Sequence, residues 1–321
     1  AYRYHMNLIK KIIKYILSLV LGYEYYEKKI FLEGINSSKI QNRIKKINNL
    51  SDLEFSVFSQ WGDDGIINWL IENLNIKKKI FVEIGTENYK ESNTRFLLMK
   101  RNWTGYLIEG NKNYTDDIKK QKIYWKYDLN IINQYVDREN INSILGKLNL
   151  PKDIGLLSLD IDGIDYWVWQ KIKIIKPVIF ICEYNAVLGD IRSLTVPYTK
   201  NFDRNKYHHS NLAFGASIKA FQKLATNKGY VLIGTNSNGV NAYFIRKEYF
   251  VKIKKKIKNI KKFSSKFRES RSNDNSKSFL RGIKRMREIE NIKFIDLDKK
   301  KIIPLKKIKR IYSNSWNNSD D

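Results

Sequence analysis

The 321-residue chain contains a single cysteine, Cys182, and only three histidines. One thiol excludes an intrachain disulfide and a metal cluster held by several thiolates, and it suits a reducing compartment. A site built on three histidines would need His5, which lies at the extreme N-terminus. We therefore expect a cytoplasmic protein without either kind of metal site.

Acidic residues are also scarce, since 33 Asp and Glu face 60 Lys and Arg, which gives a formal charge of +27. Such an excess implies an anionic partner: nucleic acid, an acidic lipid surface, or a phosphorylated or nucleotide-linked substrate. The alternative is compositional drift, because Lys, Ile and Asn are abundant throughout, as in the proteins of an AT-rich genome. A hydrophobic content of 42% excludes general disorder and favours one large domain with appendages.

No hydrophobic run is long enough to span a bilayer, and none is followed by a signal-peptide cleavage site. We expect residues 1–5 to be an expression remnant ahead of a native start at Met6. Residues 7–21 place isoleucine and leucine at helical spacing opposite Lys10, Lys11 and Lys14, which predicts an amphipathic helix. This helix either packs on its own domain or a partner subunit, or lies on an anionic membrane at its inner face. We assign residues 1–55 to an N-terminal helical segment.

From Lys79 to Lys247 short β-rich runs alternate with helical patterns, which is typical of a mostly parallel α/β sheet. The last two strands are joined by too few residues for a crossover helix, so they should form an antiparallel edge hairpin. We assign residues 56–247 to this domain. The expected strands are Ile80–Gly85, Gly105–Glu109, Ile123–Tyr127, Ile154–Asp160, Val178–Glu183, Tyr230–Gly234 and Ala242–Arg246, with helices near Gly65–Asn75, Ser92–Lys100, Asn113–Lys120, Ile131–Leu148, Tyr166–Ile174 and Ala216–Asn227.

Residues 248–321 form a basic C-terminal extension. Residues 247–310 hold 24 Lys and Arg against 7 Asp and Glu, a net of +17 by subtraction. In residues 250–263, Ile253, Ile257 and Ile260 share one helical face, which predicts an ordered helix, and residues 292–298 alternate like a strand. The extension lacks the interleaved aromatics of a single-strand binding groove, so we expect a lipid surface or a pyrophosphate as its partner rather than nucleic acid.

The first candidate for chemistry follows the strand that begins at Ile80. This strand ends in Glu83-Ile-Gly85, and a glycine at such a turn lets the backbone approach a cofactor while the carboxylate accepts hydrogen bonds from its polar end. Where further loop glycines would be expected, the chain has Glu87 and Tyr89.

Two more carboxylates stand at expected strand ends. Glu109 follows about 25 positions later, where an acidic residue suits the hydroxyls of a ribose. Asp128 ends the expected third strand, where it would accept a hydrogen bond from an adenine amino group. Each carboxylate alone also fits a strand-end turn residue. Three in succession favour a ligand site.

The densest cluster of carboxylates comes from the fourth and fifth expected strands. Asp160 and Asp162 precede a glycine turn, and Glu183 and Asn185 follow the next strand. These side chains offer hard oxygen ligands for Mg²⁺ or Ca²⁺, or one carboxylate acts as a general base. The alternative is that they cap helices and bind loop amides.

A long loop with Pro197, Tyr198, Arg204 and Tyr207 leads to His208-His209 and then into a helix. A loop of this length in a compact domain is often a substrate lid. His208 or His209 is therefore a candidate base for a sugar hydroxyl, although an exposed histidine without a role fits equally well.

From about Ser59 to Lys247 the order of elements resembles class I S-adenosylmethionine-dependent methyltransferases. The segment Leu-Ser-Leu-Asp-Ile-Asp-Gly at 157–163 is similar to the acidic motif of the FkbM-like group and of related sugar O-methyltransferases. The resemblance implies a Rossmann-like seven-stranded fold, and S-adenosylmethionine as cofactor. It assigns Glu83 and Gly85 to the cofactor loop, Glu109 to the ribose, Asp128 to the adenine, and Asp160 and Asp162 to the region of the methyl group.

In metal-dependent relatives, acids after strands four and five hold Mg²⁺, which maps here to Asp160 or Asp162 and to Glu183. The chain departs from the family in its glycine-poor loop, where Glu87 brings negative charge near the carboxylate end of the cofactor. The leading hypothesis is an O-methyltransferase acting on a nucleotide- or lipid-linked sugar in surface glycan biosynthesis. The rivals are a metal-dependent glycan-modifying enzyme on the same fold and a non-catalytic scaffold at the membrane surface. The resemblance leaves open a homo-oligomer.

Overall fold

The computed structural model describes Lys10 and residues 22–265 and 269–317. The predicted amphipathic helix at residues 7–21 lies outside these residues except for Lys10. None of the described helices is long and apolar enough to cross a membrane.

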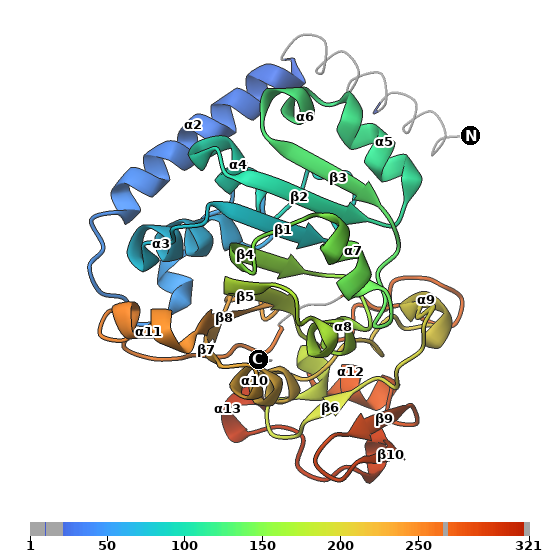
Figure 1. Ribbon diagram of the computed structural model, residues 1–321. Coiled ribbons are helices and arrows are strands. Elements are labelled where there is room, and N and C mark those ends of the chain that lie inside the picture. The colour runs from blue at the N-terminus through green and yellow to red at the C-terminus, as the bar shows by residue number, and fades with distance from the viewer. Residues whose placement is uncertain (1–9, 11–21, 266–268, 318–321) are drawn as a thin grey trace.

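A seven-stranded sheet forms the centre of the protein, in the order β3-β2-β1-β4-β5-β8-β7 (Figure 1). Strands β1 to β5 run parallel, and β8 is antiparallel to both β5 and β7. This arrangement confirms the predicted α/β sheet with its antiparallel edge hairpin. The strands are β1 Ile80–Ile84, β2 Thr104–Glu109, β3 Leu129–Asn133, β4 Asp153–Leu159, β5 Lys176–Glu183, β7 Tyr230–Thr235 and β8 Asn241–Arg246.

Helices cover both faces of the sheet, because β1, β4 and β5 carry apolar side chains on both sides. One face packs against α7 Ile141–Lys147, α8 Asp165–Lys171 and α10 Ile218–Asn227. The other packs mainly against α3 Asp63–Leu74, α4 Arg95–Arg101, α5 Lys112–Lys120 and α6 Lys122–Lys126, and α2 Tyr23–Gln41 contacts α3 from outside. The short helix η1, Leu50–Leu53, adds Leu50 and Leu53 to this second core.

The prediction for the third strand is wrong. Residues expected to form a strand at Ile123–Tyr127 form α6, and β3 follows at Leu129–Asn133, where a helix was expected to begin. Short apolar runs do not distinguish the two structures, and β3 is an edge strand with only one fully buried residue, Leu129. Asp128 therefore precedes β3 and lies at the amino ends of the parallel strands, away from the predicted adenine contact.

The C-terminal extension packs on the α/β domain. Helix α11 covers Lys247–Ile253 and then ends, so Ile257 is buried but Ile260 is 47% exposed, and the predicted helix at 250–263 is shorter than expected. The predicted strand at 292–298 is confirmed as β9, Lys293–Asp296, which pairs with β10 Lys301–Pro304 and with β6 Leu194–Thr195. The other short elements described in this part of the protein are η2 Ala186–Leu188, α9 Arg204–Tyr207, α12 Ile283–Glu288, η3 Leu305–Lys307 and α13 Asn314–Asn317.

Candidate functional site

The candidate site lies at the carboxyl ends of β1, β2, β4 and β5, which are neighbours in the sheet. Parallel strands bring the loops that follow them to one edge, so acids far apart in the sequence meet there. Four of the predicted carboxylates, Glu83, Glu109, Asp160 and Glu183, stand at or next to these ends. The predicted concentration of acids at the strand ends is present, with Asp128 as the exception.

The loop after β1 has positive φ angles at Gly85, Glu87 and Tyr89, although only the first of these residues is a glycine. Gly85 has φ 78°, and a Cβ there would come within 1.6 Å of the Asp160 carbonyl oxygen, so only glycine lets β1 and β4 approach this closely. Glu87 and Tyr89, the residues found where more glycines were expected, have φ 46° and 60°. Non-glycine residues held in this region cost about 1 kcal/mol or more each, and such strain gathers at functional sites.

The side chain of Glu83 fixes the conformation of this loop through hydrogen bonds. Its carboxylate accepts hydrogen bonds from Ser92 Oγ at 2.7 Å and from the Asn93 amide at 3.0 Å, and also from the Thr94 hydroxyl. The Tyr89 hydroxyl, fully buried, lies 2.9 Å from Thr94 Oγ1. Burial raises the pKa of Glu83, and these hydrogen bonds oppose that rise. The residue predicted to contact a cofactor therefore positions the loop and the start of α4.

Glu109 links the second strand to the same loop. Its Oε2 accepts hydrogen bonds from the amides of Thr86 at 3.0 Å and Glu87 at 2.9 Å, and its Oε1 accepts one from Asn111 at 2.8 Å. The next residue, Gly110, lies directly against the ring of Tyr135, a side chain that is 75% exposed. An exposed aromatic ring beside a strand-end carboxylate is a suitable surface for a flat heterocycle.

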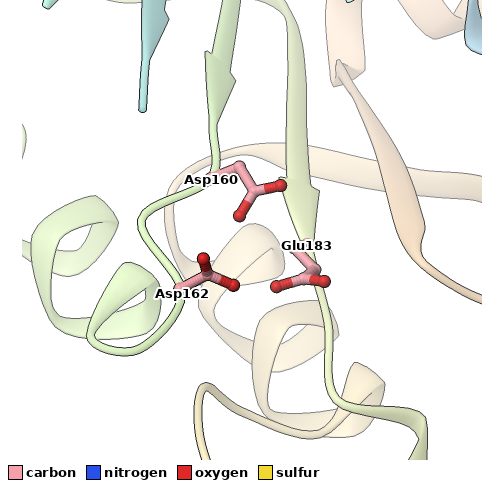
Figure 2. Close-up of side chains that lie close together, drawn as sticks. All are labelled: Asp160, Asp162 and Glu183. Atoms are coloured by element: carbon pink, nitrogen blue, oxygen red, sulfur yellow. The ribbon is translucent and has the colours of Figure 1, made fainter. Parts of the chain in front are cut away.

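Asp160, Asp162 and Glu183 form a compact cluster. Figure 2 shows Asp160 and Asp162 in the loop after β4 and Glu183 at the end of β5, with their carboxylates turned toward one another. One oxygen from each lies within 4.8 Å of the others. Three carboxylates this close suit a hard divalent cation, or any cationic ligand.

The loop that carries Asp162 is held by Asp165 at the start of α8. The Asp165 carboxylate accepts hydrogen bonds from the amides of Ile161 at 2.9 Å and Gly163 at 3.0 Å, and it imposes a turn in which Asp162 has φ 56°. Burial, together with the charge of Glu183, raises the pKa of Asp165 to about 7. Sequence reasoning did not assign this supporting role, although Asp165 lies in the motif that it singled out.

The loop predicted as a lid, from Pro197 to His209, packs on this turn together with the residues that follow it, and we call residues 197–215 the lid segment. Gly215 donates a hydrogen bond to the Gly163 carbonyl at 2.9 Å, and the Phe202 ring contacts Gly163. Arg204 forms an ion pair with Asp162. The guanidinium also acts on Glu87, whose pKa is raised by burial and by Asp162 and Glu109 and lowered by Arg204. Arg204 is thus a site residue that the sequence showed only as part of a loop.

Asn185 does not belong to the cluster as a ligand. Its Nδ2 donates to the carbonyls of Leu212 at 2.8 Å and Phe214 at 3.0 Å, while its Oδ1 accepts from the Val187 amide at 3.0 Å. The side chain is fully buried, and all of these bonds are to backbone. The prediction of Asn185 as a metal ligand is therefore wrong: it fastens the lid segment to the end of β5.

The two histidines contact other groups. His208 Nδ1 lies 2.7 Å from Ser210 Oγ, and His209 Nε2 lies 2.9 Å from Glu288 Oε1 in the C-terminal extension. Burial and the neighbouring His209 lower the pKa of His208. His209 therefore contacts the extension and His208 contacts its own loop, whereas the lid residue that contacts the acidic cluster is Arg204.

An aromatic group lies beside the cluster, and of its members the sequence prediction named only Tyr198, as part of the lid loop. The Arg138 guanidinium lies 4.0 Å from the centre of the Tyr198 ring, and Tyr198 packs edge-on against Trp167. The Tyr198 hydroxyl donates to Glu139. Trp167 follows Asp165 by two residues on α8, so this group adjoins the turn that carries Asp162. The only sequence signal was the density of Tyr and Trp in the two segments.

The site carries an excess of negative charge, whereas the chain as a whole is strongly basic. Its carboxylates outnumber its cations in a chain with a formal charge of +27. Neighbouring carboxylates repel one another, and a bound cation relieves that repulsion. A cationic ligand is therefore favoured at these strand ends. The carboxylates would attract it, and one of them could also accept a proton. The groups involved are Glu87, Glu109, Asp160, Asp162 and Glu183, facing Arg204.

No protein-family model and no curated protein matches the sequence. Among solved structures, the chain is similar to an S-adenosylmethionine-dependent methyltransferase from Clostridium acetobutylicum, with a TM-score of 0.36 and 10% identity over 57% of this chain and 90% of that one. It is also similar to the O-methyltransferase from Bacillus cereus in complex with SAH, with a TM-score of 0.37 and 13% identity over 73% and 96% of the two chains. Likenesses at this level say nothing about activity, so function has to be argued from the site.

Proposed function

We propose that the protein is an S-adenosylmethionine-dependent O-methyltransferase whose acceptor is a sugar hydroxyl on a nucleotide- or lipid-linked glycan precursor of the cell surface. The observation that carries the proposal is the concentration of carboxylates at the strand ends of an otherwise strongly basic protein. A sulfonium donor is a cation with a cationic amino group. Its charge therefore complements this site, whereas an anionic ligand alone would be repelled.

The residues at the first two strands suit the nucleoside part of such a donor. Glu109 offers a carboxylate held by the Thr86 and Glu87 amides, and a ribose hydroxyl would donate to it. The exposed Tyr135 ring beside Gly110 would support the adenine. Arg204 is paired with Asp162, and its charge also acts on Glu87. Its guanidinium would attract the donor carboxylate and so offset the repulsion between that carboxylate and Glu87. The carboxylate, the aromatic ring and the guanidinium therefore each suit one part of S-adenosylmethionine.

The aromatic group beside the cluster suits the binding of a sugar acceptor. Trp167 and Tyr198 present half-buried rings next to the Asp162 turn, with Arg138 and Glu139 beside them. Ligand sites commonly combine apolar ring surfaces with a few placed polar groups, and a sugar ring offers both a C–H face and hydroxyls. The Arg138 guanidinium adds a cation suited to a phosphate on the acceptor.

When bound, S-adenosylmethionine would supply an electrophilic methyl group on sulfur. In the proposed step the acceptor oxygen forms a bond to that carbon while the carbon–sulfur bond breaks, and its electron pair stays on sulfur to give the neutral thioether. Asp160 takes the hydroxyl proton. The Asp165-held turn and the lid segment fix the distance between the reacting atoms, and this positioning provides much of the rate.

The test is turnover of labelled donor with a panel of nucleotide-linked and lipid-linked sugars, with products identified by mass spectrometry. Asp160→Asn should lower the rate about 100-fold or more while the protein stays folded. Asp274→Asn, in an exposed turn of the extension, is the matched control and should leave the rate unchanged. Wild-type turnover by Asp160→Asn would exclude Asp160 as the base. Donor binding without product from any sugar would exclude the sugar acceptor.

The carboxylate cluster also supports a second candidate, a metal-dependent glycan-modifying enzyme that does not use this donor. Asp160, Asp162 and Glu183 would hold Mg²⁺ through one oxygen each, and the metal would polarise a substrate oxygen. The ion pair between Arg204 and Asp162 opposes this assignment, because the guanidinium already neutralises one of the three ligands. Mg²⁺ binding in the absence of donor binding would favour this candidate.

A further inference from the structure

Two lysine-rich stretches about 200 positions apart in the sequence lie side by side on the surface. Ile47 and Ile257 form a parallel β-bridge, in which the Ile47 amide donates to the Lys256 carbonyl and the Lys258 amide to the Ile47 carbonyl, both at 2.9 Å. Both isoleucines are buried, which directs the neighbouring lysines outward. The exposed side chains brought together in this way are Arg43, Lys45, Lys46, Lys254, Lys255 and Lys258.

Helix α2 leads directly into the first of these stretches and exposes apolar groups. Tyr25 is 67% exposed, Tyr26 61%, Leu32 53% and Ile40 66%. At 100° per residue they fall within one outward arc of the helix, together with Lys28, Lys29 and Lys39. The opposite arc, with Gly34, Ser38 and Gln41, is buried against the body of the protein.

We call this surface the α2–α11 face; its cations are Lys28, Lys29, Lys39, Arg43, Lys45, Lys46, Lys254, Lys255 and Lys258. The acids in α2, α11 and residues 42–48 and 254–260 are Glu24, Glu27, Glu33 and Glu248, of which Glu27 is paired with Arg95 and Glu248 with Arg246. Figure 1 shows α2 and α11 along one border of the molecule, with the chain that follows α2 running down toward α11. The charge is therefore concentrated by folding and is more than an even compositional excess.

We infer that the α2–α11 face binds the surface of a bilayer that contains anionic phospholipids. Lysines attract the lipid phosphates, and tyrosine, leucine and isoleucine side chains on the same face insert at the level of the headgroups. Tyrosine and lysine both combine an apolar stem or ring with a polar end and so suit this boundary. A nucleic acid would use the cations but gain nothing from exposed Leu32 and Ile40, so the apolar groups favour lipid.

The binding is tested by co-sedimentation of the full chain with phosphatidylcholine vesicles that contain phosphatidylglycerol. At about fivefold in affinity per lysine near an anionic surface, the triple variant K254E/K255E/K258E should bind about 100-fold more weakly or worse. The control K299E/K301E/K306E changes the net charge equally on exposed side chains of the extension. It should retain most of the binding, although long-range attraction to the vesicle will fall somewhat. Equal loss in both variants would overturn the inference, since only total charge would then matter.

A second variant separates lipid from other polyanions. L32S/I40S keeps every charge and should bind the vesicles at least about tenfold more weakly, because two apolar side chains no longer enter the interface. Its affinity for single-stranded RNA should equal that of the wild type. Wild-type vesicle binding by L32S/I40S, or RNA binding without vesicle binding by the unaltered protein, would overturn the inference. Binding of S-adenosylmethionine, measured on the same variants, reports independently on the proposed function.

Discussion

Glu109 Oε2 lies 3.0 Å from the backbone nitrogen of Thr86, and this hydrogen bond ties the end of β2 to the loop after β1. The same oxygen accepts from Glu87, which has φ 46°. The carboxylate thus fixes the conformation of a strained, glycine-poor loop. Loop support is the first role of Glu109, and ribose binding is the second role that the proposed function gives it.

Glu109→Gln should weaken both roles. The amide side chain loses the charge that the two loop amides share, which costs about 1.5–3 kcal/mol in the free energy of unfolding. The affinity for S-adenosylmethionine should fall at least about tenfold. Urea unfolding and calorimetry measure the two effects. Glu91→Gln, an exposed residue of the same loop, should change the stability by less than about 0.5 kcal/mol.

Gly85→Ala should be far more damaging than an equivalent change elsewhere. A methyl group at Gly85 would overlap the Asp160 carbonyl oxygen at 1.6 Å, whereas at Gly229, with φ 81°, a methyl group would meet no atom within 4 Å. Gly229→Ala therefore incurs only backbone strain, about 1 kcal/mol, while Gly85→Ala should lose roughly 3 kcal/mol or more. Equal losses in urea unfolding would contradict the close contact of β1 with β4.

The buried carboxyl of Asp165 should leave a pH dependence in stability. Its pKa rises from an ordinary 3.8 to about 7 in the folded protein, so the native state binds a proton that the unfolded state releases between these values. Stability must then fall as pH rises from about 4 to 7, by roughly 4 kcal/mol for this group alone.

The comparison of wild type with Asp165→Asn isolates this contribution. Denaturant unfolding at pH 4.5 and pH 8 should show the variant gaining stability relative to wild type as pH rises, because the amide cannot ionise. A constant difference across this range would show that Asp165 is ionised at its ordinary pKa.

Chelation should leave donor binding intact. Because Arg204 already neutralises Asp162, we expect the affinity for S-adenosylmethionine to change less than about twofold on addition of EDTA. Arg204→Gln should remove this neutralisation and raise the affinity of the cluster for Mg²⁺, measured by titration calorimetry. Activity that is lost with EDTA and restored by Mg²⁺ would favour the metal-dependent candidate.

The fold was predictable where a strand carries a long apolar run. β4 and β5 are buried along almost their whole length, so their sequences leave little choice of structure. β3 is an edge strand with exposed residues, and its short run Leu-Asn-Ile-Ile-Asn fits a helix start equally well. Its misplacement moved Asp128 to the wrong end of the sheet.

The candidate site was predictable only in part, for a similar reason. Glu109, Asp160 and Glu183 follow from strand ends, which the sequence marks locally. The partners that complete the site come from elsewhere in the chain: Arg204 reaches Asp162 across 42 positions, and Asn185 binds Leu212 across 27. Such contacts depend on how the lid segment folds back, which no local pattern encodes.

The most direct test of the account is calorimetric titration of the purified full chain with S-adenosylmethionine and S-adenosylhomocysteine, with and without Mg²⁺. The acidic strand ends predict micromolar binding of the donor, independent of Mg²⁺ and weakened in Glu109→Gln. Absence of binding at millimolar donor, in protein shown to be folded, would contradict the account and leave the acidic strand ends to a different cationic ligand.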